Sequence, residues 1–78
     1  MDYNENKVDD YTLALMYLVM FRDGFDIKAW KEFDWDTLGR LYEKGFITNP
    51  KGKARSVTMT EAGEEKADAL FHEFFVES

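Results

Sequence analysis

The stretch LYEKGFITNPKGKARSVTMTEAG, residues 41–63, decides the predicted fold. Gly45 is typical of a helix end, because glycine readily adopts the left-handed conformation that closes a last turn. Pro50, within NPKG, is typical of a turn, and residues 54–60 then alternate polar with apolar side chains as a half-buried strand does. Thr60 suits the N-cap of a new helix. The stretch therefore predicts a helix end, a β-hairpin and a second helix start.

Three helical segments are expected before this hairpin, and the third is the helix that ends at Gly45. Asp9 or Asp10 can cap a first helix, which the apolar run after them carries as far as Gly24. Residues 25–33, FDIKAWKEF, are expected to form a short helix, and Asp34 suits the N-cap of the next one. The predicted order is helix, helix, helix, strand, strand, helix. This is a mainly α structure with a small β-hairpin, the plan of a winged helix-turn-helix domain.

Composition limits the classes of function that the chain can have. Its 78 residues predict one domain, residues 1–78, and 45% hydrophobic with 17% aromatic content is too rich for a disordered chain. There is no cysteine and one histidine, His72, so disulfides and thiolate or histidine-based metal sites are excluded. We find no nucleophile with a base and no phosphate-binding glycine loop. The sequence therefore predicts neither an enzyme nor a cofactor.

The ends and the apolar runs of the chain indicate a cytoplasmic protein without a membrane span. The N-terminal segment MDYNENKVDD is acidic, whereas a signal peptide begins with positive charge. The longest apolar run, residues 13–21, is about half the roughly 18 residues of a membrane span.

Two resemblances follow from these motifs. LYEKGFI followed by RSVTMTEAG resembles the wing signature of MarR- and PadR-like winged-helix regulators, over residues 38–63. That resemblance implies a winged helix-turn-helix fold, although MarR-like proteins are longer and carry an acidic–Arg pair where this chain has KGKAR. The complete chain, with AWKEFDWDTLGRLYEKGFI at its centre, also resembles a family of small uncharacterised bacterial proteins, which implies no activity.

One basic region interrupts an acidic chain of net charge -6. Residues 40–55 contain five basic side chains against Glu43 alone. If duplex DNA is a partner, these side chains would contact phosphates and give little sequence preference. The alternative is a solvated hairpin tip, since lysine at a strand edge also disfavours edge-to-edge pairing. The candidate nucleic-acid-binding residues are Arg40, Lys44, Lys51, Lys53 and Arg55.

The apolar residues of the first helix cover more than one face, which predicts burial on two sides. In so short a chain we expect the second side to meet another subunit, together with the aromatic residues of the last helix. The candidate residues of this homodimer interface are Leu15, Leu18, Val19, Phe71, Phe74 and Phe75. Two functional hypotheses remain open: a transcription-associated DNA-binding protein, and a protein–protein interaction module that does not bind DNA.

Overall fold

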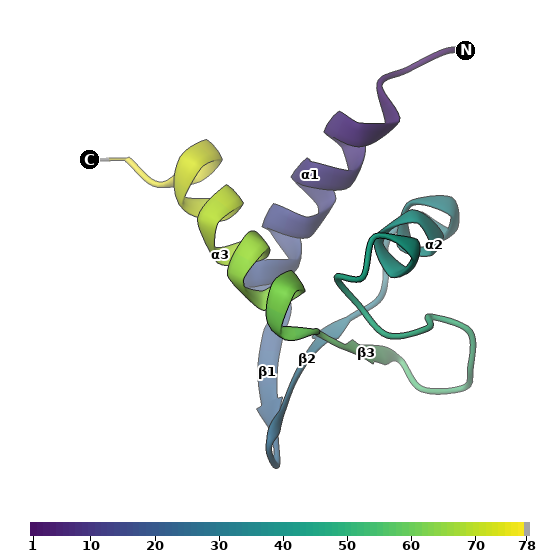
Figure 1. Cartoon of the computed structure of the whole chain (residues 1–78), viewed down its shortest axis with the longest axis vertical. Coiled ribbons are helices and arrows are strands. Elements are labelled where there is room, and N and C mark those ends of the chain that lie inside the picture. Colours follow the sequence, from purple (N-terminus) through teal and green to yellow (C-terminus); the bar gives the residue numbers. More distant parts are fainter. Residues whose placement is uncertain (78) are drawn as a thin grey trace.

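The computed structural model describes residues 1–77, and Ser78, the last residue of the predicted domain, lies outside them. Over residues 1–77 the chain forms three α-helices and one three-stranded antiparallel sheet. In chain order the elements are α1 (Glu5–Met16), a 3-10 turn η1 (Tyr17–Val19), β1 (Met20–Asp23), β2 (Asp26–Trp30), α2 (Trp35–Glu43), β3 (Ser56–Thr58) and α3 (Glu61–Phe75). Figure 1 shows α1 between α3 and α2, and α1 packs against both. The predicted α+β class is confirmed, but the predicted order is wrong.

The difference lies in residues 20–30, which form the β1–β2 hairpin instead of a helix end and a short helix. Asp23 pairs with Asp26 across a two-residue turn. Gly24 has a φ of 64° and Phe25 has no positive φ, so this is a type II′ turn, whose twist matches that of its strands. A helix-turn-helix pair needs a helix directly before α2. Between η1 and α2 the structure has these two strands.

The start of the first helix also differs from the prediction. The Asn4 side chain caps α1 by accepting a hydrogen bond from the Lys7 backbone N–H at 3.0 Å. Asp9 and Asp10 lie inside the helix, so the prediction that one of them is the N-cap is wrong. The α-helix ends at Met16, ahead of the predicted end, because the chain turns through η1 into β1.

Both predicted ends of α2 are confirmed. The Asp34 carboxylate accepts a hydrogen bond from the backbone N–H of Thr37 at 3.0 Å, as an N-cap does. Gly45 has a φ of 83°, and the Phe46 N–H donates to the Leu41 carbonyl at 3.0 Å. This is the hydrogen bond of a Schellman motif. The chain is thereby fixed in direction as it leaves α2.

The segment after α2 returns to the sheet and begins α3. Ile47 pairs with Met59 as an isolated bridge, and Val57 and Met59 are buried as the predicted alternation requires. Thr60 is confirmed as the N-cap of α3, because its hydroxyl accepts from the Gly63 N–H at 3.0 Å. The Phe46 carbonyl lies so close to α3 that a Cβ on Gly63 would overlap it.

The core lies where α1, α2 and α3 meet the sheet, and the molecule around it is thin. Its extents are 35 × 32 × 18 Å. Within residues 1–77 no helix has both the length and the apolar character that a bilayer span requires. The buried apolar residues are Leu13, Ala14, Met16, Ala29, Leu38, Leu41, Ile47, Val57, Met59, Ala67 and Leu70.

Candidate functional site

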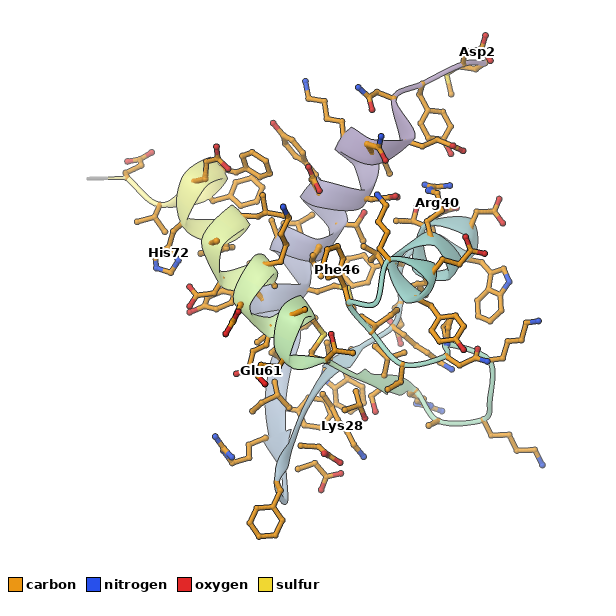
Figure 2. The ribbon with its side chains drawn as sticks, viewed as in Figure 1. Asp2, Lys28, Arg40, Phe46, Glu61 and His72 are labelled. Carbon is orange, nitrogen blue, oxygen red and sulfur yellow. The ribbon has the colours of Figure 1, made fainter. Side chains whose placement is uncertain are left out.

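Two of the predicted DNA-binding residues lie in an ion-pair cluster between α2 and α1. Arg40 donates through Nε to the Asp9 carboxylate at 2.8 Å, and Lys44 Nζ donates to the same group at 2.8 Å. The Asp9 side chain is fully buried, and the hydrogen bond that Arg40 donates to it raises the pKa of Arg40. Glu5 approaches the Arg40 guanidinium at 3.3 Å. Figure 2 shows Arg40 on α2, beside the N-terminal half of α1. Both cations are thus engaged within the chain.

The other three predicted DNA-binding residues lie on the exposed loop between Ile47 and β3. Lys51, Lys53 and Arg55 are exposed. The loop is held near its middle, because Lys31 Nζ donates to the Pro50 carbonyl at 2.7 Å. The same Lys31 ammonium also donates to the carbonyl of residue 52 at 3.2 Å. The structure therefore separates the predicted basic patch into a paired cluster on α2 and a tethered loop that presents free cations.

The sequence did not indicate that Lys31 anchors this loop. Its backbone N–H also donates to the Arg55 carbonyl at 3.1 Å, which continues the pairing of β2 with β3. Once β2 is known to be a strand, a lysine directly after it that faces a strand partner becomes a candidate anchor. Because residues 25–33 are predicted to form a helix, no strand partner is expected for Lys31.

The predicted interface residues divide into two groups. Phe74 stacks on Tyr11 of α1 with ring centroids 4.4 Å apart, and Phe71 stacks on Tyr17 at 5.0 Å. Val19 also packs against the core. These side chains join α3 to the N-terminal half of the same chain. The second group stays open to solvent, with exposed fractions of 42% for Leu15, 65% for Leu18 and 40% for Phe75.

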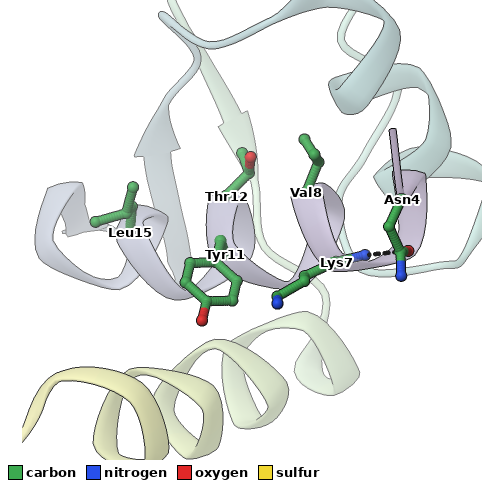
Figure 3. A pocket seen from close by; sticks show the side chains of 6 residues that line it. All are labelled: Asn4, Lys7, Val8, Tyr11, Thr12 and Leu15. Atoms are coloured by element: carbon green, nitrogen blue, oxygen red, sulfur yellow. Dashed lines mark hydrogen bonds between the residues drawn. The ribbon is translucent and has the colours of Figure 1, made fainter. Parts of the chain in front are cut away.

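A groove of about 400 Å³ runs along α1 beside this second group. Figure 3 looks onto α1 with α3 alongside and shows the side chains that line the groove. The Asn4 side chain at one end is satisfied by its N-cap hydrogen bond. The lining residues are Asn4, Lys7, Val8, Tyr11, Thr12 and Leu15, and most of their exposed surface there is apolar. We name Tyr11, Leu15, Leu18, Phe75, Val76 and this groove the α1–α3 face.

The titratable side chains of residues 1–77 form no cluster with the composition of a metal site. No group of three His, Cys, Asp or Glu side chains is placed there to hold a metal ion. His72 lies exposed on α3, and its Nδ1 is 2.8 Å from the Asp68 carboxylate one turn away.

Comparison with known proteins places this fold in a family. The family described as "Domain of unknown function (DUF6429)" matches residues 4–77. The chain belongs to this family. It is 39% identical over 75 residues to "Uncharacterized protein y4hR" of Sinorhizobium fredii (strain NBRC 101917 / NGR234), a match that covers 96% of this chain and 97% of the relative. No solved structure matches the chain. The expected membership of a small bacterial family without a stated activity is confirmed, and the DUF6429 description assigns no ligand.

Proposed function

We propose that this DUF6429 protein is a protein–protein interaction module that works as a homodimer through its α1–α3 face. The observation that carries the proposal is the exposure of Leu15, Leu18 and Phe75 beside an apolar groove. Burial of these side chains would stabilise the protein, since each fully buried leucine or phenylalanine contributes about 1.5–3 kcal/mol. Exposed apolar patches are where soluble proteins commonly meet their partners.

The total surface supports the same proposal. The chain exposes 5516 Å². A compact monomer of its mass, 9.2 kDa, exposes about 4,900 Å². The excess of about 600 Å² approaches the roughly 800 Å² that each partner contributes to a stable protein interface. A dimer would bring the accessible surface of each chain down to or below that of a compact monomer.

A C2 arrangement fits the composition of the face. In a C2 dimer the same residues meet on both chains, so an apolar strip must be able to pack on itself. Leu15, Leu18 and Val76 are uncharged and can do so without burying like charges. The one cation that lines the groove, Lys7, has a long stem that keeps its ammonium in water at the rim.

The experiment is a mass measurement by light scattering over a dilution series. At the dilute end of the series, where weaker contacts dissociate, the unaltered chain should have the mass of two copies, and Leu18→Glu should have the mass of one, because a buried carboxylate has no partner there. Lys53→Gln is the matched control, since it changes the net charge by the same amount on a different surface and should stay dimeric. A single-copy mass for the unaltered chain at every concentration would sink the proposal.

Duplex DNA is the second candidate partner, and the exposed loop favours it. Lys51, Lys53 and Arg55 stand free on a loop that Lys31 holds in place, as a phosphate-contacting wing would require. The winged-helix interpretation of α2 and this loop belongs to the same candidate. It is supported less well than the dimer, because Arg40 and Lys44 already pair with Asp9.

A titration with duplex DNA at several salt concentrations tests this candidate. Three phosphate contacts predict that log affinity falls with log salt at a slope of about −3, from about −0.9 for each contact. Replacing Lys51 and Lys53 together by alanine should bring the slope to about −1. Absence of binding at low salt, or an unchanged slope in the double variant, would rule the candidate out.

A further inference from the structure

Gly39 has no structural reason to be glycine within its own chain. It lies in the middle of α2, where glycine is destabilising relative to alanine because it loses more backbone freedom. A Cβ added at Gly39 would meet no atom within 4 Å, and the residue does not need a positive φ. Trp35 and Tyr42 flank it on the exposed face of the helix. Close approach of another molecule to α2 is a physical role that a glycine at this position can serve.

A pocket of about 200 Å³ opens at this place. A cavity of about 150 Å³ holds a benzene ring, whereas pockets for small-molecule ligands begin at about 300 Å³. The pocket therefore has the size for one aromatic side chain, and Trp35 and Tyr42 supply walls on which a ring can pack. Its lining residues are Trp35, Gly39, Tyr42, Glu43, Asn49, Pro50 and Lys51.

The chain itself presents one aromatic side chain in the form such a pocket requires. Phe25, at the tip of the β1–β2 hairpin, has an exposed fraction of 103%, the highest of any aromatic side chain in residues 1–77. It stands on a two-residue type II′ turn, which limits the backbone freedom lost when the ring is bound. In Figure 1 this tip lies at the far end of the hairpin from α2, so the pocket cannot be filled by the tip of its own chain.

We propose that the α2 pocket binds Phe25 from the hairpin tip of a second copy of this chain. One pair of opposite charges accompanies the contact: Asp26 directly follows Phe25, and Lys51 lines the pocket. The other carboxylate of the tip, Asp23, is already paired with Lys28 at 2.7 Å, and Glu43 lines the pocket as well. Opposite charges at the rim of a contact steer the partners together and fix their orientation. Lys51 thereby gains a carboxylate partner on the second copy.

The contact is heterologous, because a tip on one copy meets a pocket on another. Each chain has one tip and one pocket, so successive copies can join head to tail. The surface involved is smaller than a standard interface, which indicates a weak and reversible contact. It uses neither Leu15 nor Leu18 and goes beyond the proposed α1–α3 dimer. The two contacts together would link dimers into larger assemblies.

Two variants separate the halves of the contact. Phe25→Ala removes the tip and keeps the pocket, and Gly39→Leu fills the pocket and keeps the tip. Neither change touches the core, since Phe25 is fully exposed and a side chain at Gly39 points into open space. Both variants are made in the Leu18→Glu chain, so that success or failure of the α1–α3 dimer does not influence the result. Circular dichroism should show unchanged folding.

The measurement follows the two tryptophan indole N–H signals in ¹⁵N-labelled Phe25→Ala chain by NMR. Addition of unlabelled Gly39→Leu chain should shift the Trp35 signal and leave the Trp30 signal in place, because Trp30 stacks on Phe21 away from the pocket. The mixture should reach the mass of two copies and no more. Each variant alone should associate about thirtyfold more weakly than the mixture, the loss expected when a central aromatic anchor is removed.

Two outcomes would overturn the proposal. One is an unchanged Trp35 signal in the mixture. The other is an equal shift when the added chain carries Phe25→Ala as well as Gly39→Leu, because the occupant would then be some group other than Phe25. A Trp35 shift that needs both an intact tip on one chain and an open pocket on the other supports it.

Discussion

The Arg40 guanidinium of α2 donates through its Nε to both oxygens of the Asp9 carboxylate in α1, at 2.8 and 3.1 Å. The Asp9 side chain is fully buried and that of Arg40 is 20% exposed. A buried carboxylate needs compensating donors, because transfer of an unpaired charge out of water is very costly. Arg40 therefore joins two helices, and its first role is in stability.

Replacement of Arg40 by alanine should lower the free energy of unfolding by about 3 kcal/mol, the low end of the cost of unpairing a buried charge. Lys44 remains beside Asp9 and prevents a larger loss. Lys51→Ala, the same loss of charge on the exposed loop, should change stability by no more than about 0.5 kcal/mol. Urea unfolding of the three proteins measures the difference, and equal stability of the two variants would contradict the structural role of Arg40.

Two glycine-to-alanine changes should have opposite signs. Gly63→Ala should destabilise by about 1–3 kcal/mol or more, since the added methyl overlaps the Phe46 backbone, which cannot turn aside as a flexible side chain would. Gly39→Ala should stabilise by about 0.5–1 kcal/mol, because it restores helix propensity in open space. Thermal unfolding of both variants checks this. If Gly63→Ala melted no lower than the unaltered chain, the close approach of Phe46 would be wrong.

Loss of the α3 N-cap should weaken the junction between Gly45 and that helix. The Thr60 hydroxyl accepts from the Gly63 N–H at 3.0 Å and donates to the Gly45 carbonyl at 2.6 Å. Thr60→Ala should therefore cost about 1 kcal/mol, the usual value for an N-cap. Thr60→Ser keeps the hydroxyl and should retain most of the stability in denaturant unfolding. A serine variant as unstable as the alanine variant would show that the methyl group, and not the cap, matters.

The Asp34 cap should make stability depend on pH in the acid range. Hydrogen bonds from the Thr37 hydroxyl and backbone N–H lower the pKa of Asp34 below its ordinary value of 3.8. A lowered pKa in the folded state stabilises the fold above the unfolded pKa, and this contribution is lost as the pH falls through the folded pKa. Asp34→Asn removes the titrating group. Urea midpoints of the two proteins from about pH 6 to about pH 2 should therefore converge toward the acid end. A difference that is constant with pH would contradict the assignment.

Signals that act over a few residues predicted their structures correctly. Asp34, Gly45 and Thr60 were placed at helix ends from their residue types alone, because a cap is completed by a backbone group two to four residues away. The same holds for the buried positions Val57 and Met59, which follow the period of a strand.

Contacts between distant segments were not predictable in this way. The apolar run of α1 continues without a break into β1, so its end at Met16 has no local marker. In residues 26–30 the alternation that places Ile27 and Ala29 on one face of a strand is also compatible with a short helix. Asp9 lies 31 residues from Arg40, and nothing near either residue indicates the pairing. For this reason the predicted basic patch included two cations that the fold uses internally.

The positions of the chain ends have a practical consequence for how the protein is handled. In Figure 1 the N-terminus and the C-terminal end of α3 both lie away from the hairpin tip. Asn4 lines the α1 groove and Val76 belongs to the α1–α3 face, so an affinity tag or fluorescent protein fused to either terminus would crowd that face. The mass of the dimer should therefore be measured on protein without a tag. A reporter at the N-terminus would lie at the far end of the molecule from the hairpin tip.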